Sequence, residues 1–550
     1  MRAIEAGLRF LLDHGVKYVF GIPAGSINAL YDALFDLPEM KPIVVKHETS
    51  AGYAASAYTR ITGIPSLCVG SSGPGATNLI TAAANAWKEK LPVIFITGSV
   101  PSTKIGKGGA QELGAEAIFA PVTKLSQTVL EANQLPAAIA EALHAAQSGV
   151  PGPVHLAIPI DIQMTDIGSV SQPVLPLLEP KHSHAGDLSA AAELIRRTGT
   201  RGALLLGFGA KSARRAIQLF AEKTGWPVAT TPRGKGSFPE DHPLSLGVYG
   251  LSGHDDAICA LNGSQHDVLF VIGSSLGELA TGNWSAELLE GKKLIHLDYD
   301  EHEFGKNYVP TVRLCGDIPL TIEELIFHLP SKEIPDKSYR TVKEAQIAIG
   351  QNSNEQLWNT QQVIRKIGEF APANSRFYID IGEFMTYSVQ NLLIHSEQDF
   401  DIDINFGAMG SGIGGVLGAQ LAEPDRPHIC ITGDGCFFMH GFEVLTAKEY
   451  GLPVIYFVIN NARLGMVYHG HMLQYERCLD DFSQFRVNIA SIAKAMGIRY
   501  KQVKSHNQFR REHMKNWIDG QGPMIVEIVV EGNEIPPMGE RVKFLQGATY

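Results

Sequence analysis

Short apolar runs that end in Gly or Pro recur along the whole chain, and they constrain the fold more than any other feature. Near-continuous runs of this kind are typical of strands that are covered on both faces of a sheet. Helical segments separate the runs, which favours parallel α/β sheets. The runs form three groups: VKYVFGIP (16–23), PSLCVGS (65–71), LPVIFITG (91–98) and PVHLAIP (153–159); RGALLLGFG (201–209), WPVATT (226–231), DVLFVIG (267–273) and KKLIHLD (292–298); RFYIDIG (376–382), HICITGDG (428–435), LPVIYFVINN (452–461) and PMIVEIVV (523–530). The sequence therefore predicts three α/β domains, each with a doubly wound parallel sheet.

Two stretches without apolar periodicity separate the groups. Residues 170–184 are rich in proline, and residues 329–354 are polar and charged. A chain of 550 residues is expected to hold about three or four domains. We predict domains over residues 1–168, 185–330 and 354–550.

Charge and cysteine usage exclude several classes of protein. The formal net charge is −11, so the basic surface of a nucleic-acid-binding protein is not expected. No apolar run is long enough to span a bilayer, and residues 1–14 read as an amphipathic helix rather than a signal peptide. The 6 cysteines are widely spaced and form no CxxC pair, which implies neither a zinc site nor a disulfide framework. We expect a cytoplasmic protein without nucleic-acid or membrane partners.

The sharpest chemical signal follows two neighbouring strands of the third group. HICITGDG ends in Gly433-Asp434-Gly435, and the next strand ends in Asn460-Asn461. The carboxyl ends of adjacent parallel strands share one edge of the sheet, which is where ligands bind in open α/β sheets. Carboxylate and amide oxygens suit Mg²⁺, and Gly433 and Gly435 let backbone groups approach a diphosphate. The pattern predicts a site for Mg²⁺ and a diphosphate.

At this point the sequence resembles the thiamine-diphosphate enzymes, in the group of acetolactate synthase, pyruvate oxidase and the 2-oxo-acid decarboxylases. The resemblance covers nearly the whole chain, in the order pyrimidine-binding, middle and diphosphate-binding domain. It implies that Asp434, Asn461 and the backbone carbonyl of Arg463 hold Mg²⁺.

The segment KHETSAGYAASAYTR (46–60) places Glu48 at a strand-to-helix junction. By itself a glutamate in the first turn of a helix is a dipole partner. The resemblance implies instead that Glu48 bonds N1′ of the aminopyrimidine and promotes loss of the proton from thiamine C2. The loop SSGPGATN (71–78) matches a family loop near the cofactor, which makes Gly73 and Asn78 candidate contacts.

The resemblance also assigns cofactor contacts in the glycine-rich segment NFGAMGSGIGG (405–415). Met409 matches an apolar residue that lies under the cofactor and bends it, and Gly407 offers backbone groups to the pyrimidine. Further cofactor contacts implied in the same way are Gly25, Cys436 and Met466.

Two segments resemble the substrate side of acetolactate synthases. GGAQE (108–112) places Gln111 at the reaction centre, and VTKLS (122–126) places Lys124 near the substrate carboxylate. Ala110 replaces a phenylalanine of the family, which predicts a roomier pocket. For Lys124 a solvated surface position is an equal alternative.

Several residues depart from the family pattern. Glu383-Phe384 stand where the family has Gln-His, which puts one diphosphate contact in doubt. His440 replaces an asparagine and is a candidate for proton transfer. His469 and His471 are further candidates, and packed or surface histidines are the alternative for all three.

The middle domain leaves FAD an open question. GSSLGELATGNW (273–284) lacks the arginine that flavin-binding synthases carry there, and Arg233 is a possible substitute. Residues 462–478 resemble a mobile segment over the cofactor, and residues 533–545 resemble a C-terminal arm that closes the site.

The resemblance implies decarboxylation of a 2-oxo acid, pyruvate by default, followed by carboligation to a second carbonyl compound. The alternatives are a non-ligating decarboxylase or 2-hydroxyacyl lyase, a flavin-linked oxidase, and a non-catalytic protein that binds the cofactor. The family builds its sites between chains, which implies a homodimer or homotetramer.

Overall fold

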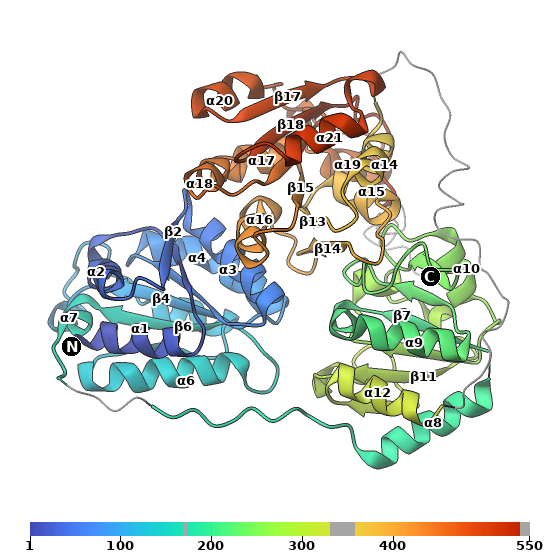
Figure 1. Ribbon diagram of the computed structural model, residues 1–550, viewed down its shortest axis with the longest axis horizontal. Helices are drawn as coiled ribbons and strands as arrows, with labels where there is room; N and C mark the ends of the chain where they lie inside the picture. The colour runs from blue at the N-terminus through green and yellow to red at the C-terminus, as the bar shows by residue number, and fades with distance from the viewer. Residues whose placement is uncertain (169–172, 200, 330–357, 539–550) are drawn as a thin grey trace.

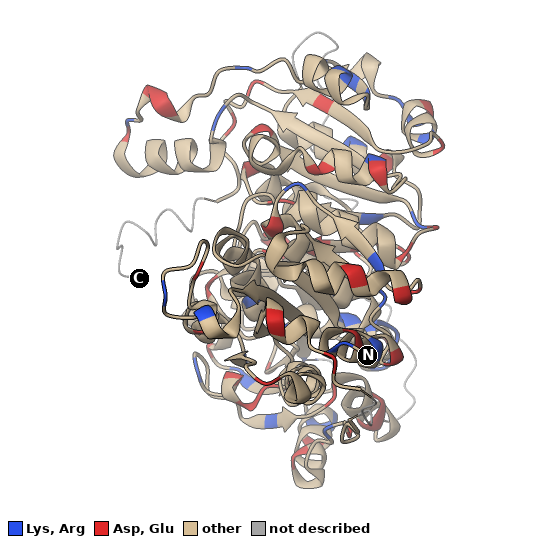
Figure 2. Ribbon diagram, turned by 90° about the vertical axis from the view of Figure 1, so that its left-hand side faces the viewer, with Lys and Arg blue, Asp and Glu red and all other residues tan. Residues whose placement is uncertain are grey.

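The computed structural model describes residues 1–168, 173–199, 201–329 and 358–538. It contains three six-stranded parallel sheets with helices packed on them. Figure 1 shows the first domain in blue to teal, the middle domain in green to yellow and the third domain in gold to red, with α16 of the third domain beside α3 of the first. Acidic and basic residues are interspersed along the chain (Figure 2).

The first domain has the strand order β2-β1-β3-β4-β6-β5. Its strands are β1 (Tyr18–Gly21), β2 (Lys41–Val44), β3 (Ser66–Gly70), β4 (Val93–Ser99), β5 (Ser126–Thr128) and β6 (Val154–Pro159). Its helices are α1 (Ala3–Asp13), α2 (Asn28–Ala33), α3 (Glu48–Thr62), α4 (Pro74–Lys88), α5 (Ala115–Phe119), α6 (Leu135–Gln147) and α7 (Ile160–Met164).

The middle domain has the order β12-β11-β10-β7-β8-β9. Its strands are β7 (Gly202–Leu206), β8 (Val228–Thr230), β9 (Ser245–Val248), β10 (Val268–Ile272), β11 (Lys293–Asp298) and β12 (Val312–Cys315). Its helices are α8 (Ala185–Thr198), α9 (Arg214–Thr224), α10 (Asp255–Asn262), α11 (Glu278–Thr281) and α12 (Ile318–Phe327).

The third domain has the order β14-β13-β15-β16-β18-β17. Its strands are β13 (Arg376–Ile379), β14 (Asp399–Ile402), β15 (His428–Gly433), β16 (Ile455–Asn460), β17 (Arg499–Val503) and β18 (Met524–Val529). Its helices are α14 (Thr360–Phe370), α15 (Glu383–Asn391), α16 (Ser411–Ala422), α17 (Asp434–His440), α18 (Glu443–Glu449), α19 (Gly465–Tyr475), α20 (Ile489–Met496) and α21 (Arg511–Ile518).

The predicted fold class is confirmed, and each predicted apolar run contains one of the four central strands of a sheet. The six strands that the sequence pattern missed are the two edges of each sheet: β2, β5, β9, β12, β14 and β17. Edge strands pair on one side only, and some of these carry polar residues among the apolar ones, as in RYKQV of β17. The domain boundaries stay predictions, and the second linker lies largely outside the described residues.

The first and third domains are joined by close packing of α3 against α16. Nearly all of α3 is buried, and α16 presents Gly414 and Gly418 to it. A Cβ at Gly418 would overlap the carbonyl of Ala54, and one at Gly414 would lie 3.1 Å from the Cα of Ser50. The two helices therefore approach backbone to backbone, and one hydrophobic core runs through both domains.

A buried ion cluster links all three domains at the far end of α3. Arg60 pairs with Asp403 of the third domain and lies 3.5 Å from Glu89 of the first. Arg60 also donates to the Tyr378 hydroxyl at 2.6 Å. Arg233 of the middle domain pairs with the same Glu89. Because these groups are almost fully buried, removing one of them would leave its partner as a buried charge without full compensation.

This cluster predicts a large effect of removing one partner. Asp403→Ala leaves Arg60 buried with one carboxylate fewer, and we expect it to destabilise the protein by about 3–5 kcal/mol. Calorimetry should show the first thermal transition shifted to a lower temperature. The control is Asp267→Ala, which breaks the exposed Arg201 pair, where both side chains are more than 50% exposed, and should have little effect. Equal shifts for both variants would contradict a special role of the cluster.

Candidate active site

The first turns of α3 and α4, at the carboxyl edge of the first sheet, bring Glu48 and Asn78 together. Glu48 is the first residue of α3, and its Oε2 accepts a hydrogen bond from Asn78 Nδ2 at 2.9 Å. The Thr49 hydroxyl donates to the Asn78 carbonyl at 2.5 Å. The Glu48 side chain is half-buried and therefore reachable from outside the chain. This is the place in which the resemblance puts the pyrimidine contact.

The loops that carry Gly25, Gly73 and Gln111 meet at the same edge. Gly73 caps α4 with a φ of 64°, and a Cβ there would lie 3.0 Å from the Gln111 carbonyl oxygen. Gln111 itself has a φ of 61°, which is costly for a residue with a side chain. Ser72 ties the loops together, because its hydroxyl donates to Gln111 O at 2.5 Å and its N–H donates to Ser26 Oγ at 3.0 Å. The structure thus holds an exposed glutamine in a strained conformation beside the start of α4, the helix that carries Asn78.

Lys124 lies elsewhere. Its Nζ donates to the Ser148 carbonyl at 2.5 Å, and its Cδ would be 3.0 Å from a Cβ at Gly152, which also adjoins Trp87. Trp87 is near the end of α4 opposite to Gly73, and 15 residues of helix separate these ends by roughly 20 Å. The placement separates Lys124 from Gln111, so its predicted role at the substrate carboxylate is not part of our proposal.

The carboxyl edge of the third sheet brings Asp434 and Asn461 together. They follow β15 and β16, which pair in register through Gly433 and Ile459. Asp434 is 4% exposed, and burial raises its pKa to about 6. Hydrogen bonds from the backbone N–H groups of Gly435 and Ala462 partly oppose this rise by lowering the pKa. Asn461 is also buried, and its Oδ1 accepts from Arg463 N at 3.0 Å. A buried carboxylate and an amide oxygen at one edge are the hard donors that Mg²⁺ takes, so these residues fit the metal.

The turn after Asn461 has the strained backbone typical of a functional site. Ala462 has a φ of 54°, and the next residue, Arg463, donates from Nη1 to the Gly532 carbonyl at 2.8 Å. This contact fixes the segment that carries the predicted Arg463 carbonyl ligand.

Met409 and the glycines around it line the start of α17. A Cβ at Gly435 would be 3.2 Å from Met409 Cε, so the methionine lies over this glycine. Gly407 and Gly410 adopt φ values of 74° and 91°, which a side chain would not tolerate well. Of the remaining candidates, Cys436 donates from Sγ to Ile381 O at 3.0 Å, and Met466 packs against the third-domain core.

Glu383 and Phe384, the departures from the family pattern, lie directly at this edge. Glu383 Oε1 accepts a hydrogen bond from Asn461 Nδ2 at 2.6 Å, and Glu383 Oε2 is 3.7 Å from His469 Nε2. Burial raises the pKa of Glu383 to about 7, and nearby Asp434 contributes. The Phe384 ring fills the space beside Gly433. Sequence comparison marked Glu383 as unusual but did not indicate its bond to the expected metal ligand.

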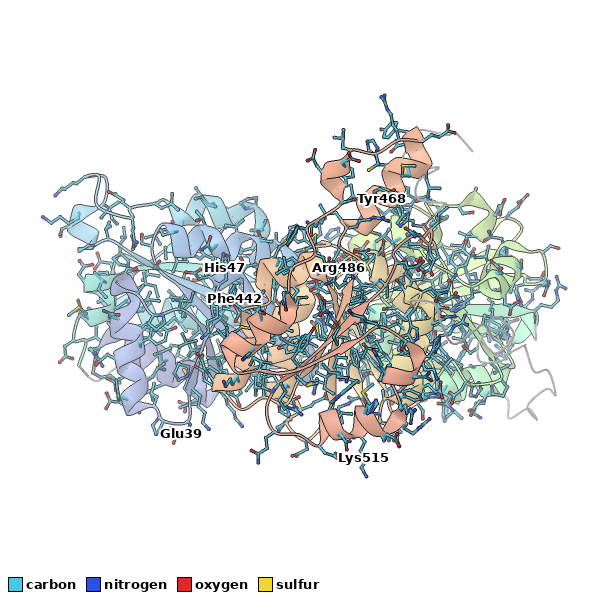
Figure 3. The ribbon with its side chains drawn as sticks, turned by 90° about the horizontal axis from the view of Figure 1, so that it is seen from above. Glu39, His47, Phe442, Tyr468, Arg486 and Lys515 are labelled. Atoms are coloured by element: carbon cyan, nitrogen blue, oxygen red, sulfur yellow. The ribbon has the colours of Figure 1, made fainter. Side chains whose placement is uncertain are left out.

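His440 is packed between the first and third domains. Its Nδ1 lies 2.9 Å from Ser50 Oγ, and its ring is edge-on to His47. Burial and the neighbouring His47 lower the pKa of His440 to about 4. Figure 3 shows His47 beside Phe442, which follows His440 closely in the chain. His440 therefore packs at the interface between the first and third domains of one chain, and we do not assign it the predicted role in proton transfer.

Glu443 is a functional candidate that the sequence reasoning missed. It is 1% exposed, and its carboxylate accepts from the backbone N–H groups of Lys46 and His47, both at 3.0 Å. It therefore holds the residues that immediately precede Glu48. The only sequence feature that could have indicated Glu443 is its place in Phe442-Glu443, shortly after the helix that follows Gly433.

The other two histidines make contacts within the third domain. His469 Nε2 is 3.1 Å from Gly532 O, and His471 Nδ1 is 2.5 Å from Arg477 O. The His471 ring packs on Tyr475 and Phe482 of its own segment. Of the predicted closing arm, residues 533–538 are described and the rest lies outside the described residues.

A cavity of about 560 Å³ lies where the three domains meet. Its lining cations each pair with a carboxylate: Arg60 with Asp403, Lys90 with Asp300, Lys211 with Asp401, and Arg376 with Asp399 and Asp401. Arg233, the possible flavin-phosphate partner, pairs with Glu89 and lies 4.0 Å over the Phe208 ring. Arg233 thus does not fit the role of a free phosphate ligand. None of the described helices is long and apolar enough to cross a membrane.

Three family profiles match the chain in order. They are described as thiamine pyrophosphate enzyme, N-terminal TPP binding domain (residues 1–118), central domain (188–325) and C-terminal TPP binding domain (380–528). These ranges contain the Glu48 edge, the middle sheet and the Asp434 edge respectively.

Curated relatives are similar along nearly the whole chain. A probable acetolactate synthase large subunit of Methanocaldococcus jannaschii is 32% identical, with 99% of this chain and 95% of the relative aligned. The acetolactate synthase isozyme 1 large subunit of Escherichia coli is 31% identical, over 96% of this chain and 95% of the relative. The acetolactate synthase large subunit of Corynebacterium glutamicum is 33% identical, over 98% and 88%. With three matching domains and relatives of this extent, the chain belongs to the thiamine pyrophosphate enzymes.

Proposed function

We propose that this enzyme decarboxylates a 2-oxo acid, with pyruvate as the default donor, and joins the remaining unit to a second carbonyl compound. The observation that carries the proposal is the presence of two complementary half-sites in one chain. Glu48 lies at the edge of the first sheet, and Asp434 and Asn461 lie at the edge of the third. The relatives named acetolactate synthase support carboligation as the outcome.

When bound, thiamine diphosphate would supply an acidic C–H group whose conjugate base adds to the substrate carbonyl, and a ring that accepts the electron pair released with CO₂. Glu48 would hold a proton at N1′ of the aminopyrimidine, and Asn78 keeps its carboxylate in place. Asp434, Asn461 and the Arg463 carbonyl would bind Mg²⁺, which joins the diphosphate to the protein. Met409 would support the bent form of the cofactor.

A second copy of the chain would complete each site. Glu48 bonds to its own domain, and the first helical turn of α3 is held by α17 and α18 of the same chain. Next to this turn Phe438, Met439 and Phe442 are exposed by 39%, 57% and 61%. An apolar surface of this kind is typical of a protein interface. We infer a homodimer, or a dimer of dimers, in which Glu48 serves the cofactor held by its partner.

The substrate pocket would be wider than in the family pattern. Ala110 is exposed next to Gln111, and its small side chain leaves room for a donor larger than pyruvate. FAD is not part of the proposal, and the expected cytoplasmic location stays a prediction.

The proposal is tested by an NMR time course of the protein with thiamine diphosphate, Mg²⁺ and pyruvate. We expect pyruvate to be consumed and acetolactate to appear. Acetaldehyde as the only product would favour the non-ligating decarboxylase. If pyruvate and a series of bulkier 2-oxo acids all remained unconsumed with cofactor bound, the proposed activity would be wrong.

Glu48→Gln should separate cofactor binding from cofactor activation. The amide keeps the size of the side chain but cannot hold the proton as a carboxylate does, so exchange of the thiamine C2 proton should slow by about 100-fold or more. Acid-quenched hydrogen–deuterium exchange measures this rate, and isothermal titration measures cofactor affinity, which should change little. Exchange at the wild-type rate would exclude the proposed role of Glu48.

Phe442→Asp should weaken the association of two chains. A charge on this exposed apolar surface has to be desolvated in the interface, so sedimentation should show more monomer at low concentration, with a parallel loss of turnover. Phe327→Asp is the control, because Phe327 is 85% exposed on the middle domain, at the end of α12. An unchanged dimer in the Phe442 variant would place the interface elsewhere.

A further inference from the structure

Glu383 occupies a position from which it acts on the expected metal ligand. It begins α15, directly after β13, and β13 neighbours β15 in the sheet. Its side chain is 4% exposed and reaches across the edge to Asn461. Glu383 thus lies at the same edge as Asp434 and Asn461.

The hydrogen bond from Asn461 Nδ2 to Glu383 Oε1, 2.6 Å long, fixes the orientation of the Asn461 amide. Glu383 Oε1 accepts this bond, so the amide nitrogen of Asn461, and not its oxygen, faces Glu383. The oxygen, Oδ1, therefore points away from Glu383, and it accepts from Arg463 N at 3.0 Å. A glutamine in this place could donate to Oδ1 instead and would permit the opposite orientation.

The second carboxylate oxygen of Glu383 is buried without a hydrogen-bond partner among the described residues. It lies against the backbone of Gly465, where a Cβ would overlap it, and 3.7 Å from His469 Nε2. A buried carboxylate oxygen without a partner is costly, and Asp434 adds a second carboxylate to the same region. Such an arrangement is stabilised when a cation enters.

We propose that Glu383 is a positioning residue of the cation site, which turns Asn461 Oδ1 toward the cation and makes the site bind a divalent cation ahead of the cofactor. The inference rests on the proposed cation site at Asp434 and Asn461. Its consequence concerns the order of binding. Without a cation, the diphosphate would meet two carboxylates, and the like charges would oppose its binding. With the cation in place, the repulsion is offset and the diphosphate completes the coordination.

The test uses full-length, cofactor-free protein and Mn²⁺ as the probe, followed by electron paramagnetic resonance. Glu383→Gln keeps the shape of the side chain but removes its charge and its strict preference for the amide nitrogen. Residues that orient a metal ligand typically contribute 10–100-fold to affinity, so we expect the dissociation constant of Mn²⁺ to rise by about tenfold or more. In EDTA, thiamine diphosphate should bind the variant more tightly than the wild type.

Glu527→Gln is the matched control. Glu527 is 1% exposed, lies in the same sheet and accepts a hydrogen bond from Nδ2 of the neighbouring Asn460, also at 2.6 Å. The same substitution there should leave Mn²⁺ affinity unchanged. Circular dichroism and thermal unfolding of both variants establish that they fold.

The outcomes separate this inference from the proposed function. Equal Mn²⁺ affinity in wild type and Glu383→Gln, or an equal loss in Glu527→Gln, would overturn the role of Glu383. If only Asp434→Ala weakened Mn²⁺ binding, the cation site would stand and the inference about Glu383 would fail. Glu383-dependent Mn²⁺ binding by a protein that consumes no 2-oxo acid would support the inference and contradict the proposed function.

Discussion

The backbone-to-backbone contact of α3 with α16 determines where both half-sites lie. Gly414 and Gly418 allow it, because any side chain there would push the helices apart. The contact places the first turn of α3, with Glu48, next to α17, which begins with Asp434. A wider spacing of the two helices would change the position of Glu48 relative to the third domain, and with it the geometry of the proposed site between two chains. The buried pair of Arg60 and Asp403 holds the other end of the same helix.

The α3–α16 contact also explains why α17 and α18 touch the first domain through polar groups. His440 and Glu443 bind Ser50 and the backbone N–H groups of Lys46 and His47. Hydrogen bonds have stricter geometry than apolar contacts, so they set the direction of the Glu48 turn as well as its distance. Because α17 starts at the expected cation and ends at these bonds, a displacement at Asp434 would be felt at the Glu48 of the same chain.

Much of the fold and part of the site follow from local sequence. The central strands are predictable because burial on both faces requires continuous apolar runs, whereas an edge such as β17 carries polar residues among the apolar ones and leaves no such run. Asp434 and Asn461 are predictable as neighbours because strand ends share an edge. Lys124 and His440 are not, because their partners, Ser148 and Ser50, are chosen by loop paths and domain packing. A short sequence motif carries no information about loop paths or domain packing.

Glu383 illustrates the opposite case. The sequence shows that a glutamate replaces a glutamine, but only the structure shows which group the carboxylate binds. Exchange of an amide for a carboxylate leaves the size of the side chain nearly unchanged. What changes is the hydrogen-bond chemistry, because a carboxylate cannot donate. With Asn461 as its partner, this difference determines which atom of the asparagine faces Glu383, and so which atom would face a cation in the proposed site. The proposed metal site would therefore be tuned by a residue that need not touch the metal, and a bound cation would compensate its buried charge.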